Sequence, residues 1–431
     1  MRVLGVGDTV DLGDMYLRLA ARGHDVRVQV ADADARDMLA GMIDLGGAWD
    51  EDLAWVGRDG LLVFESASRG AQQDELRAAG YQVVGGSAFG DALEQDRELG
   101  QQTLRDAGLR TLPAHRFTSF DEGIAFVART RRRYVLKFNG TGWASMRNYV
   151  GMREDGLDMQ GAIAHQRDRW TLPETDIDFI LMDFAQGVEV GVGAFFDGTR
   201  FLGPPNLDWE HKRLFNGDLG ELTGEMGTVV SYRGAERLFA ATLGRLEARF
   251  AAAGHRGYVN LNMIVNAEGT WPLELTCRFG YPGYSILEAL HAEPWDTTLL
   301  RMVHGDGSSV ATHDGYAVGV VLTVPPFPYS EGYVRLSKGV PIIIPGDLTD
   351  EERHHLHFAE VALDARGQLV TSGVVGYILV VTGRGPTIAE AQRAAYTLAK
   401  KIAIPNVRYR TDIGDRLIAH DLAELARLGW L

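Results

Sequence analysis

Residues 1–90 alternate short apolar runs with stretches of helical composition, and this pattern restricts the fold more than any other feature. The apolar runs are VLGVG, DVRVQV, LLVFES and YQVV, and segments such as MYLRLAARG and QQDELRAAG separate them. Strands that alternate with helices form a parallel sheet, because each helix carries the chain back to the end where the strands begin. The sequence therefore predicts an N-terminal Rossmann-like parallel α/β domain over residues 1–93.

The length of the chain requires more than one hydrophobic core, since 431 residues correspond to about three domains of ordinary size. Strand-like runs at 134–138, 178–184 and 188–196 are joined by glycine-rich connections, which favours an α+β middle region with more antiparallel character. We expect this second domain to cover residues 94–310, and a small α+β domain to cover residues 311–431.

The segment PTIAEAQRAAYTLAKKI near the C-terminus has the pattern of a packed amphipathic helix. Thr387 and Glu390 have the spacing of a capping box, which satisfies the first amide groups of a helix. Apolar residues then recur at steps of three and four, as one buried helix face requires; these are Ile388, Ala391, Ala395, Leu398 and Ile402.

The net charge of −15 argues against a nucleic-acid partner, because a phosphate backbone demands a basic stripe and none is visible. The basic cluster RTRRR at 129–133 is short and leads into a strand, so a solvated loop edge is favoured over a nucleic-acid patch. No apolar stretch approaches the length of a membrane span, and the N-terminus enters a strand at once. We expect a soluble cytoplasmic protein without a membrane partner.

Cysteine and histidine usage gives little sign of a metal centre built from these residues. The single cysteine, Cys277, excludes an intramolecular disulfide and is expected to be a small packed residue. The run HHLH at 354–357 lacks a further spaced ligand, so a solvated loop is favoured there.

The runs YVNLNMIV and WPLEL flank NAEGT, which predicts a β-hairpin. With a three-residue turn, Asn262 lies opposite Glu274 and Asn260 opposite Thr276, so that all four side chains share one face. Arg278 continues this face. A carboxylate beside neutral oxygen donors suits Mg²⁺. The alternative is the polar outer face of a half-buried sheet, which the pattern taken alone favours.

The stretch NLDWEHKRLFNGDLGELTGEMG at 206–227 places His211, Lys212 and Arg213 side by side in an acidic chain. It holds too many glycines for a stable helix and too little alternation for a strand, so we expect an ordered loop. Three adjacent basic residues in such a loop suit a substrate that is itself an anion.

Six segments occur in an order that resembles the ATP-grasp superfamily, and most closely phosphoribosylamine–glycine ligase. They are VVGGS with ALEQDR, YVLKFNGTG, FAQGVEVGVGAFFDG, DWEHKR with NGDLGELTGEMG, PLELTCRFGYPGY and LVTSGVVGYILVVTGRGPTIAEAQRAAY. The resemblance covers nearly the whole chain, and the fixed order of the segments carries it. It implies a central ATP-grasp fold with a lid subdomain at about 115–187, and a ligase of purine biosynthesis.

The resemblance assigns ATP binding to Arg97, Lys137, Gly140, Gly142, Asp183 and Glu189. Arg97 stands where a lysine is usual, Lys137 is at the phosphate-binding lysine, and Glu189 is at the position that holds the ribose. Glycines in the phosphate loop let backbone amides approach phosphate oxygens. Two alternatives stay open: Lys137 as an edge lysine whose amine reaches solvent, and Glu189 as a solvent-facing glutamate.

The resemblance assigns catalysis to His211, Lys212, Arg213 and Arg278, and metal binding to Glu274, Asn262 and Thr276. An acyl phosphate forms when a carboxylate attacks the terminal phosphate of ATP, and cations must neutralise the developing charge. The implied cofactors are ATP and Mg²⁺, with Mn²⁺ as an alternative. The implied substrates are an amino-acid carboxylate and an amine acceptor, and the implied assembly is a monomer or homodimer.

Two departures from the family concern the ATP site. Ser145 stands where the family has a second lysine, with Arg147 as a candidate substitute, and Thr276 replaces an asparagine beside the metal glutamate. These changes leave open a non-catalytic relative that binds a nucleotide.

A third departure concerns the acceptor. The loop GVGDTVDLGD carries Asp8, Asp11 and Asp14 where the family receives a sugar phosphate, and these carboxylates would repel a phosphate at a helix N-terminus. The sequence therefore favours an amine acceptor other than phosphoribosylamine, or one whose phosphate binds elsewhere.

Overall fold

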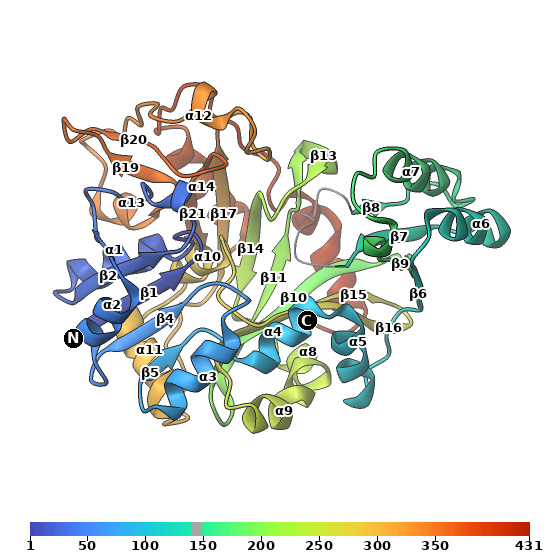
Figure 1. Cartoon of the computed structure of the whole chain (residues 1–431), viewed down its shortest axis with the longest axis horizontal. Coiled ribbons are helices and arrows are strands. Elements are labelled where there is room, and N and C mark those ends of the chain that lie inside the picture. The colour runs from blue at the N-terminus through green and yellow to red at the C-terminus, as the bar shows by residue number, and fades with distance from the viewer. Residues whose placement is uncertain (140–147) are drawn as a thin grey trace. The chain divides into compact units, whose positions relative to one another are not determined.

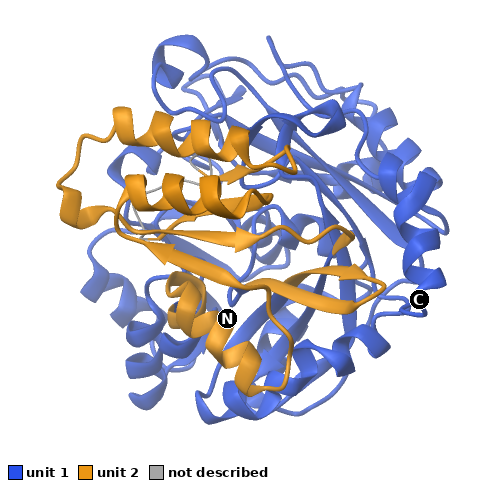
Figure 2. Cartoon of the chain, turned by 90° about the vertical axis from the view of Figure 1, so that its right-hand side faces the viewer, with its two compact units in different colours: residues 1–91, 190–261, 275–431 blue, residues 92–189, 262–274 orange. Residues whose placement is uncertain are grey.

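The structure, a computed structural model, describes residues 1–139 and 148–431. The described chain forms two compact units (Figure 2). Unit 1 comprises residues 1–91, 190–261 and 275–431, and unit 2 comprises residues 92–189 and 262–274. The strands that run across the boundary are β10 (Val188–Asp197), β15 (Arg256–Asn266) and β16 (Gly269–Thr276). The three-domain division expected from the sequence stays a prediction, because compactness separates only these two units.

Unit 1 begins with a five-stranded sheet in the order β3-β2-β1-β4-β5, in which every neighbouring pair is parallel (Figure 1). Its strands are β1 (Arg2–Gly7), β2 (Asp25–Val30), β3 (Asp44–Leu45), β4 (Leu61–Phe64) and β5 (Gln82–Val84). The connecting helices are α1 (Gly13–Ala21), α2 (Trp49–Val56) and α3 (Gly70–Ala78). All of β4 is buried, as expected for a strand inside a parallel sheet. The predicted parallel α/β layer is confirmed.

A larger sheet has the strand order β16-β15-β10-β11-β14-β17-β21-β18. Its further strands are β11 (Phe201–Glu210), β14 (Gly227–Ser231), β17 (Tyr316–Thr323), β18 (Leu356–Phe358) and β21 (Tyr377–Gly385). The pairs from β10 to β11, β11 to β14, β14 to β17 and β17 to β21 are antiparallel, which agrees with the predicted α+β character of this region.

Helix α14 (Ile388–Ala399) packs on β17 and β21 through the apolar face predicted from the sequence. The side chain of Thr387 caps the helix by accepting from the Glu390 amide. A Cβ at Gly383 would lie 2.3 Å from the backbone nitrogen of Ala395, so glycine is needed for this close approach of helix and strand. The helix ends at Ala399, and Ile402 is buried beyond it.

The remaining elements of unit 1 are short. The helices are α8 (Glu236–Ala241), α9 (Glu247–Ala252), α10 (Gly283–Glu288), α11 (Trp295–His304), α12 (Tyr333–Leu336), α13 (Asp350–His354) and α15 (Leu422–Arg427). Strands β19 (Val361–Leu363) and β20 (Leu369–Thr371) form a separate antiparallel pair. No helix within the described ranges is long and apolar enough to cross a membrane.

Unit 2 is built on a four-stranded antiparallel sheet in the order β6-β9-β7-β8. The strands are β6 (Ala114–Phe117), β7 (Tyr134–Phe138), β8 (Tyr149–Val150) and β9 (Phe179–Asp183). Helices α6 (Phe120–Thr130) and α7 (Leu157–Asp168) cover one face, with Tyr134, Leu136 and Phe138 in the core beneath them (Figure 1).

The helical segment predicted at 94–107 is two helices, α4 (Ala88–Gln95) and α5 (Arg97–Asp106). Asp96 separates them because its side chain accepts from the amides of Glu98 and Leu99. This N-cap places Arg97 at the first position of α5.

The segment 206–227 is more regular than the predicted loop. Residues up to Glu210 belong to β11, and β12 (Arg213–Phe215) pairs with β13 (Leu219–Leu222) as a hairpin. Gly217 at φ 69° adopts the left-handed backbone in the turn of this hairpin, and Gly220 at φ 81° adopts it within β13, where the pairing with β12 is irregular. The prediction missed β11 because it pairs with β10 and β14, and it missed β12 and β13 because three and four residues are too few to show strand alternation.

The histidine run at 354–357 is not a solvated loop, as the sequence had suggested. His355 and His357 are buried, and both contact the Thr382 hydroxyl at 2.8 and 2.9 Å, respectively. Pairing of β18 with β21 brings them to this position, and burial lowers the pKa of both imidazoles. Cys277 is buried, as predicted.

Candidate functional site

Three residues predicted for the ATP site converge within unit 2. The Lys137 Nζ lies 3.4 Å from Oε2 of Glu274, and the Arg97 Nη1 lies 3.6 Å from the same oxygen. The Glu274 side chain is 41% exposed, whereas that of Lys137 is 13% exposed. One accessible carboxylate therefore lies between two cations that come from different elements of the unit.

Local structure accounts for the positions of both cations. Strand β7 alternates between buried and half-buried residues, so Lys137 points away from the core formed by Tyr134, Leu136 and Phe138. Arg97 opens α5 because Asp96 caps that helix. The sequence predicts the first of these positions through its alternation, and the second requires the cap to be recognised.

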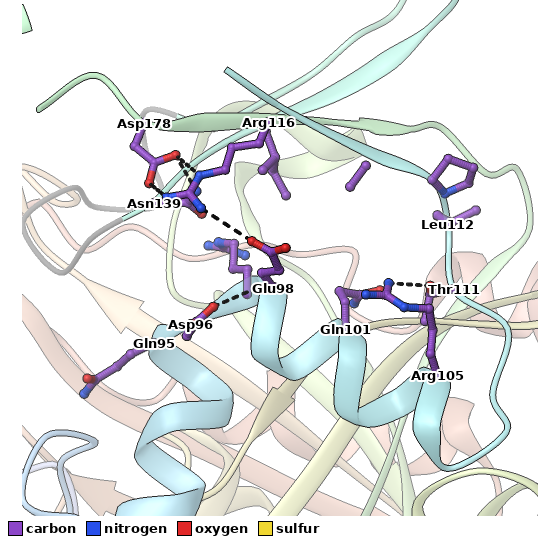
Figure 3. A pocket seen from close by; sticks show the side chains of 14 residues that line it. Gln95, Asp96, Glu98, Gln101, Arg105, Thr111, Leu112, Arg116, Asn139 and Asp178 are labelled. Atoms are coloured by element: carbon purple, nitrogen blue, oxygen red, sulfur yellow. Dashed lines mark hydrogen bonds and ion pairs between the residues drawn. The ribbon is translucent and has the colours of Figure 1, made fainter. Parts of the chain in front are cut away.

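Arg97 also lines a pocket of unit 2 with a volume of about 760 Å³. The pocket lies between α5 and the sheet, with Gln101 and Arg105 on the helix side and Leu112 and Ile180 among its apolar residues (Figure 3). The pocket is large enough for a small organic molecule.

Asp178 organises the polar side of this pocket. Figure 3 shows the side chains of Arg116 and Asn139 turned toward Asp178. Arg116 donates two hydrogen bonds to its carboxylate at 2.9 and 2.7 Å, and Asn139 donates one at 2.9 Å. Arg116 also lies 3.4 Å from Glu98. These contacts fix the polar wall before any ligand binds.

The other residues predicted to bind ATP have different surroundings. The Asp183 carboxylate lies 3.6 Å from Arg132 and 4.0 Å from His115, so its charge is already countered. Glu189 is half-buried between the buried Val188 and Val190. Roles for both residues stay predictions.

The predicted phosphate loop extends beyond the described residues. Gly140 and Gly142 lie outside the described residues, as do Ser145 and Arg147. Their predicted roles therefore rest on the sequence alone.

The predicted metal strand forms a hairpin, but its turn has two residues, Ala267 and Glu268, instead of three. The Asn266 side chain shortens the turn by accepting from the Glu268 amide and from the Trp271 indole. In an unbroken ladder this shift moves each pairing by one residue, so the face predicted to be shared by Asn262 and Glu274 no longer follows from the turn.

The residues of the predicted metal site differ in burial. Asn262 is buried and Thr276 is half-buried at the end of β16. Asn260 donates to Asp208 at 2.6 Å. Among the residues that the structure describes, no three His, Cys, Asp or Glu side chains form a group that could hold a metal ion.

The residues predicted for catalysis lie in unit 1. His211 Nε2 accepts from the Gly414 amide at 3.2 Å, and burial and Arg410 lower the pKa of the imidazole. His211 is therefore neutral near pH 7, which does not support its predicted contribution of positive charge. Lys212 pairs with Glu210 at 3.0 Å, and Arg213 donates to the Gly220 carbonyl at 2.7 Å.

Arg278, the fourth predicted catalytic residue, donates to the Phe279 carbonyl at 3.3 Å. Its side chain is half-buried just after β16. Roles for Arg278, Lys212 and Arg213 stay predictions.

Arg410 connects the hairpin after Lys212 to the C-terminal segment through hydrogen bonds and ion pairs. Its side chain is 2% exposed, and it binds Asp412 through two hydrogen bonds of 2.8 Å. It also donates to Asp218 at 2.8 Å and to the Arg213 carbonyl at 3.1 Å. The position of the basic triplet thus depends on residues far along the chain.

Sequence reasoning missed an acidic cluster in the same part of unit 1. Asp208 is buried, and its Oδ2 accepts from Asn260 and Asn206. Burial, reinforced by Glu210, raises the pKa of Asp208 to about 7, and burial also raises that of Glu225. The sequence feature that could have revealed this cluster is the presence of acidic residues within and around the basic motif.

The acidic first loop is largely neutralised. Asp8 pairs with Arg69 at 2.8 Å, and Asp14 contacts both Arg18 at 2.6 Å and His357 at 2.8 Å. Asp11 accepts from the Thr9 hydroxyl. The predicted repulsion of a phosphate by all three aspartates is therefore weakened, because two of their charges are paired.

A different carboxylate lies at the start of α1. Glu65 is buried, and it accepts from the Leu12 amide at 2.9 Å and from the Tyr16 hydroxyl at 2.6 Å. Burial, with the neighbouring Asp11, raises its pKa to about 8. The side chain of Glu65 therefore accepts the hydrogen bond of an amide at the N-terminus of this helix.

Glu65 is expected to make the fold less stable as the pH rises. Its pKa is about 8 in the folded chain against an ordinary 4.5, so the folded state binds the proton more tightly. The stability that this proton contributes to the folded state is complete below about pH 4.5 and is lost as the pH rises through about 8. Glu65→Gln keeps the size of the side chain and an oxygen that accepts from the Leu12 amide, while its NH2 group can donate to the Tyr16 oxygen. It should flatten this decline in melting temperature between pH 5 and 8.

The control for this measurement is Glu75→Gln, because Glu75 is exposed on α3. Its melting profile should follow that of the unmodified protein. Parallel profiles for the unmodified protein and Glu65→Gln would show that Glu65 does not carry the pH dependence.

Two family models match separate parts of the chain. Residues 96–284 match the phosphoribosylglycinamide synthetase ATP-grasp (A) domain, and residues 317–416 match the phosphoribosylglycinamide synthetase C domain. Phosphoribosylamine–glycine ligase of Neisseria meningitidis serogroup B is 26% identical over 360 residues, which cover 80% of this chain and 81% of the relative. The Thermotoga maritima ligase is 31% identical over 241 residues, 54% of this chain and 56% of its own.

Solved structures show the same fold. The crystal structure of phosphoribosylamine–glycine ligase from Thermotoga maritima has a TM-score of 0.72 and 23% identity, covering 96% of this chain and 100% of its own. A biotin carboxylase from Campylobacter jejuni has a TM-score of 0.64 and 11% identity, with coverage of 99% and 98%. The predicted combination of a parallel N-terminal layer, an ATP-grasp domain and a C-terminal domain is confirmed.

Proposed function

We propose, from the premise that this chain belongs to the ATP-grasp superfamily and carries the ATP-grasp and C domains of phosphoribosylglycinamide synthetase, that it joins glycine to phosphoribosylamine. The chain is an ATP-dependent ligase that forms a carbon–nitrogen bond through an acyl phosphate. The named relatives provide the proposed substrates, since their names specify phosphoribosylamine and glycine.

The convergence of Lys137 and Arg97 on Glu274 is the observation that best supports this function. Two cations close to one carboxylate would repel each other unless an anion lay between them. In our proposal, Glu274 provides that anion before ATP binds. When ATP binds, its phosphates become the anion between the two cations. The pair is thus ready to receive negative charge without large movement.

The chemistry of acyl phosphate formation explains why such a pair is useful. The attack of a carboxylate on the terminal phosphate spreads negative charge over the phosphate oxygens. Lys137 and Arg97 would stabilise this charge more than they stabilise bound ATP, and that difference lowers the barrier. The resulting acyl phosphate reacts with the amine to form the amide and release phosphate.

One residue present, Glu274, fits a magnesium ion, because its carboxylate is accessible. Asn262 and Thr276 stay predicted ligands, since the two-residue turn does not place Asn262 on the face of Glu274. Mg²⁺ commonly binds one or two carboxylates and completes its shell with waters and substrate phosphates. When bound, the ion would neutralise phosphate charge, and Mn²⁺ has similar requirements.

Product analysis provides the direct test of this function. The protein is incubated with ATP, Mg²⁺, glycine and phosphoribosylamine, and the products are examined by mass spectrometry. We expect glycinamide ribonucleotide, ADP and phosphate in equal amounts. ATP turnover that requires glycine but yields no glycinamide ribonucleotide would reject phosphoribosylamine as the acceptor and keep the ligase chemistry.

A second candidate is the same ligation with an amine that carries no phosphate. Glu65 supports it, because its carboxylate already accepts from the Leu12 amide at the N-terminus of α1. A helix N-terminus at which an internal acid already accepts from an amide has fewer free donors for a substrate phosphate. A competition between phosphoribosylamine and unphosphorylated amines, with glycine and ATP held constant, separates the two candidates.

Arg97→Met is expected to raise the KM for ATP about fivefold to tenfold and to slow turnover less than loss of Lys137 does. Arg97 is the more exposed of the two cations and lies farther from Glu274, so solvent screens more of its charge. Steady-state kinetics with varied ATP test this. Arg129→Met, a change of an exposed arginine on α6 outside the pocket lining, is the control. Equal KM values for Arg97→Met and the unmodified protein would exclude a role in ATP binding.

A further inference from the structure

The acidic cluster of unit 1 is built by two neighbouring strands. Asp208 and Glu210 are two residues apart on β11, so their side chains leave the strand on the same face. Glu225 comes just before β14, the strand that pairs with β11. The amide of Met226 donates to the His211 carbonyl at 2.8 Å, which holds Glu225 beside the end of β11.

Two carboxylates of this cluster are buried and incompletely paired. Asp208 is 5% exposed and Glu225 is 6% exposed. Within the described parts of the chain, Oδ1 of Asp208 and Oε1 of Glu225 have no hydrogen-bond partner. A buried polar atom without a partner is costly, so both oxygens are positioned for a donor that the described chain does not provide.

The rest of the cluster is rigid around these oxygens. Asn260 and Asn206 hold the other oxygen of Asp208, and the Tyr258 hydroxyl donates to Asn206 at 3.0 Å. A Cβ at Gly191 would lie 2.1 Å from Oδ1 of Asp208, so the opposite strand leaves space for this carboxylate only because it has glycine there. The backbone amide of Glu225 donates to the Tyr377 hydroxyl at 3.2 Å.

The charge of the cluster indicates what kind of donor it accepts. Three carboxyl groups meet here, and Lys212 is already paired with Glu210 at 3.0 Å. A ligand with positively charged N–H groups would satisfy both oxygens and reduce their mutual repulsion. No three acidic or histidine side chains in the described ranges have the geometry of a metal site, which favours an organic ammonium.

We infer that Asp208 and Glu225 form a subsite that binds a positively charged amino group of the acceptor. This inference rests on the proposed ligase function, since the acceptor of that reaction is an amine; glycine also carries an amino group and is kept saturating in the test. The ammonium is either the group that reacts, after it gives one proton to a carboxylate of the cluster and becomes the neutral amine, or a second one on the same molecule. Both sources share the same chemistry, and the choice of amine distinguishes them.

The test uses Asp208→Asn and Glu225→Gln, which remove charge and keep size. With ATP and the carboxylate saturating, each variant should raise the KM for the amine at least about tenfold and leave the KM for ATP within about twofold. Glu221→Gln is the matched control, because Glu221 lies on the nearby strand β13 and outside the cluster. Circular dichroism and melting temperatures establish that the variants fold.

Three amines separate the two sources. Phosphoribosylamine and 1-aminobutane each carry one amino group, and 1,4-diaminobutane carries two. A loss with all three amines assigns the subsite to the reacting group, and a loss with the diamine alone assigns it to a second ammonium. An unchanged amine KM in folded, active variants would overturn the inference while leaving the ligase function intact.

If the unmodified protein makes no product, the proposed function is rejected, and the subsite must be tested by binding instead of by activity. Titration calorimetry with 1,4-diaminobutane then tests the subsite alone. Binding that weakens at least about tenfold in Asp208→Asn supports the subsite. No binding, or equal binding by the unmodified protein and the variant, overturns it.

Discussion

Glu274→Gln is expected to lower kcat at least about a hundredfold while the protein remains folded. The glutamine keeps the size of the side chain but removes the charge that faces Lys137 and Arg97, and it is a poorer ligand for Mg²⁺. Because the side chain is 41% exposed, the free energy of unfolding should change by less than about 1 kcal/mol. Release of ADP at saturating ATP and Mg²⁺ measures the effect on turnover.

Glu268→Gln provides the control for this prediction, because Glu268 is in the turn of the same hairpin and is exposed. It should retain the activity of the unmodified protein. Activity of Glu274→Gln within threefold of the unmodified protein at saturating Mg²⁺ would rule out the proposed metal role.

Lys137→Ala is expected to reduce kcat/KM for ATP by roughly 100-fold to 1,000-fold, since one cation that meets developing charge in a dry site contributes about 2 to 4 kcal/mol. The side chain is only 13% exposed, so little solvent screens its charge. Its removal also leaves Glu274 with Arg97 as the remaining cation of this group. Steady-state kinetics and nucleotide titration measure the rate and the affinity separately.

The control for Lys137 is Lys400→Ala, an exposed lysine just after α14. This change should leave kinetics and nucleotide affinity as they are. If Lys137→Ala also leaves both unchanged, Lys137 is an edge lysine whose amine reaches solvent, which is the alternative that the strand pattern allows.

Local patterns predicted the strands and helices whose residues determine their own structure. The run YVLKF becomes β7 with the predicted bounds, and its alternation of buried and half-buried residues turns Lys137 away from the core. The face of α14 follows from the spacing of its apolar residues. In these elements, side-chain period and capping depend on neighbours in the sequence, so the sequence is sufficient.

Features that depend on distant residues could not be predicted in the same way. Asp208 reads as one more polar residue of a loop, and only its contact with Asn260 reveals it as a buried acid. The turn before β16 shortens because Asn266 bonds to Trp271, and a sequence pattern does not specify that contact. His357 is buried because β18 joins β21. Tertiary contacts decide each case.

The buried guanidinium of Arg410 makes the hairpin beside Lys212 sensitive to shortening of the chain. It ties residues 213–218 to the last part of the chain, so a protein shortened before residue 410 would leave Asp218 without its partner and the hairpin beside Lys212 without its anchor. The Asp218 side chain is 52% exposed, so the lost contacts of Arg410 would loosen the hairpin without leaving a buried unpaired charge. Removing the C-terminal residues from Arg410 onward to improve crystals or yield would therefore disturb the hairpin beside the basic triplet.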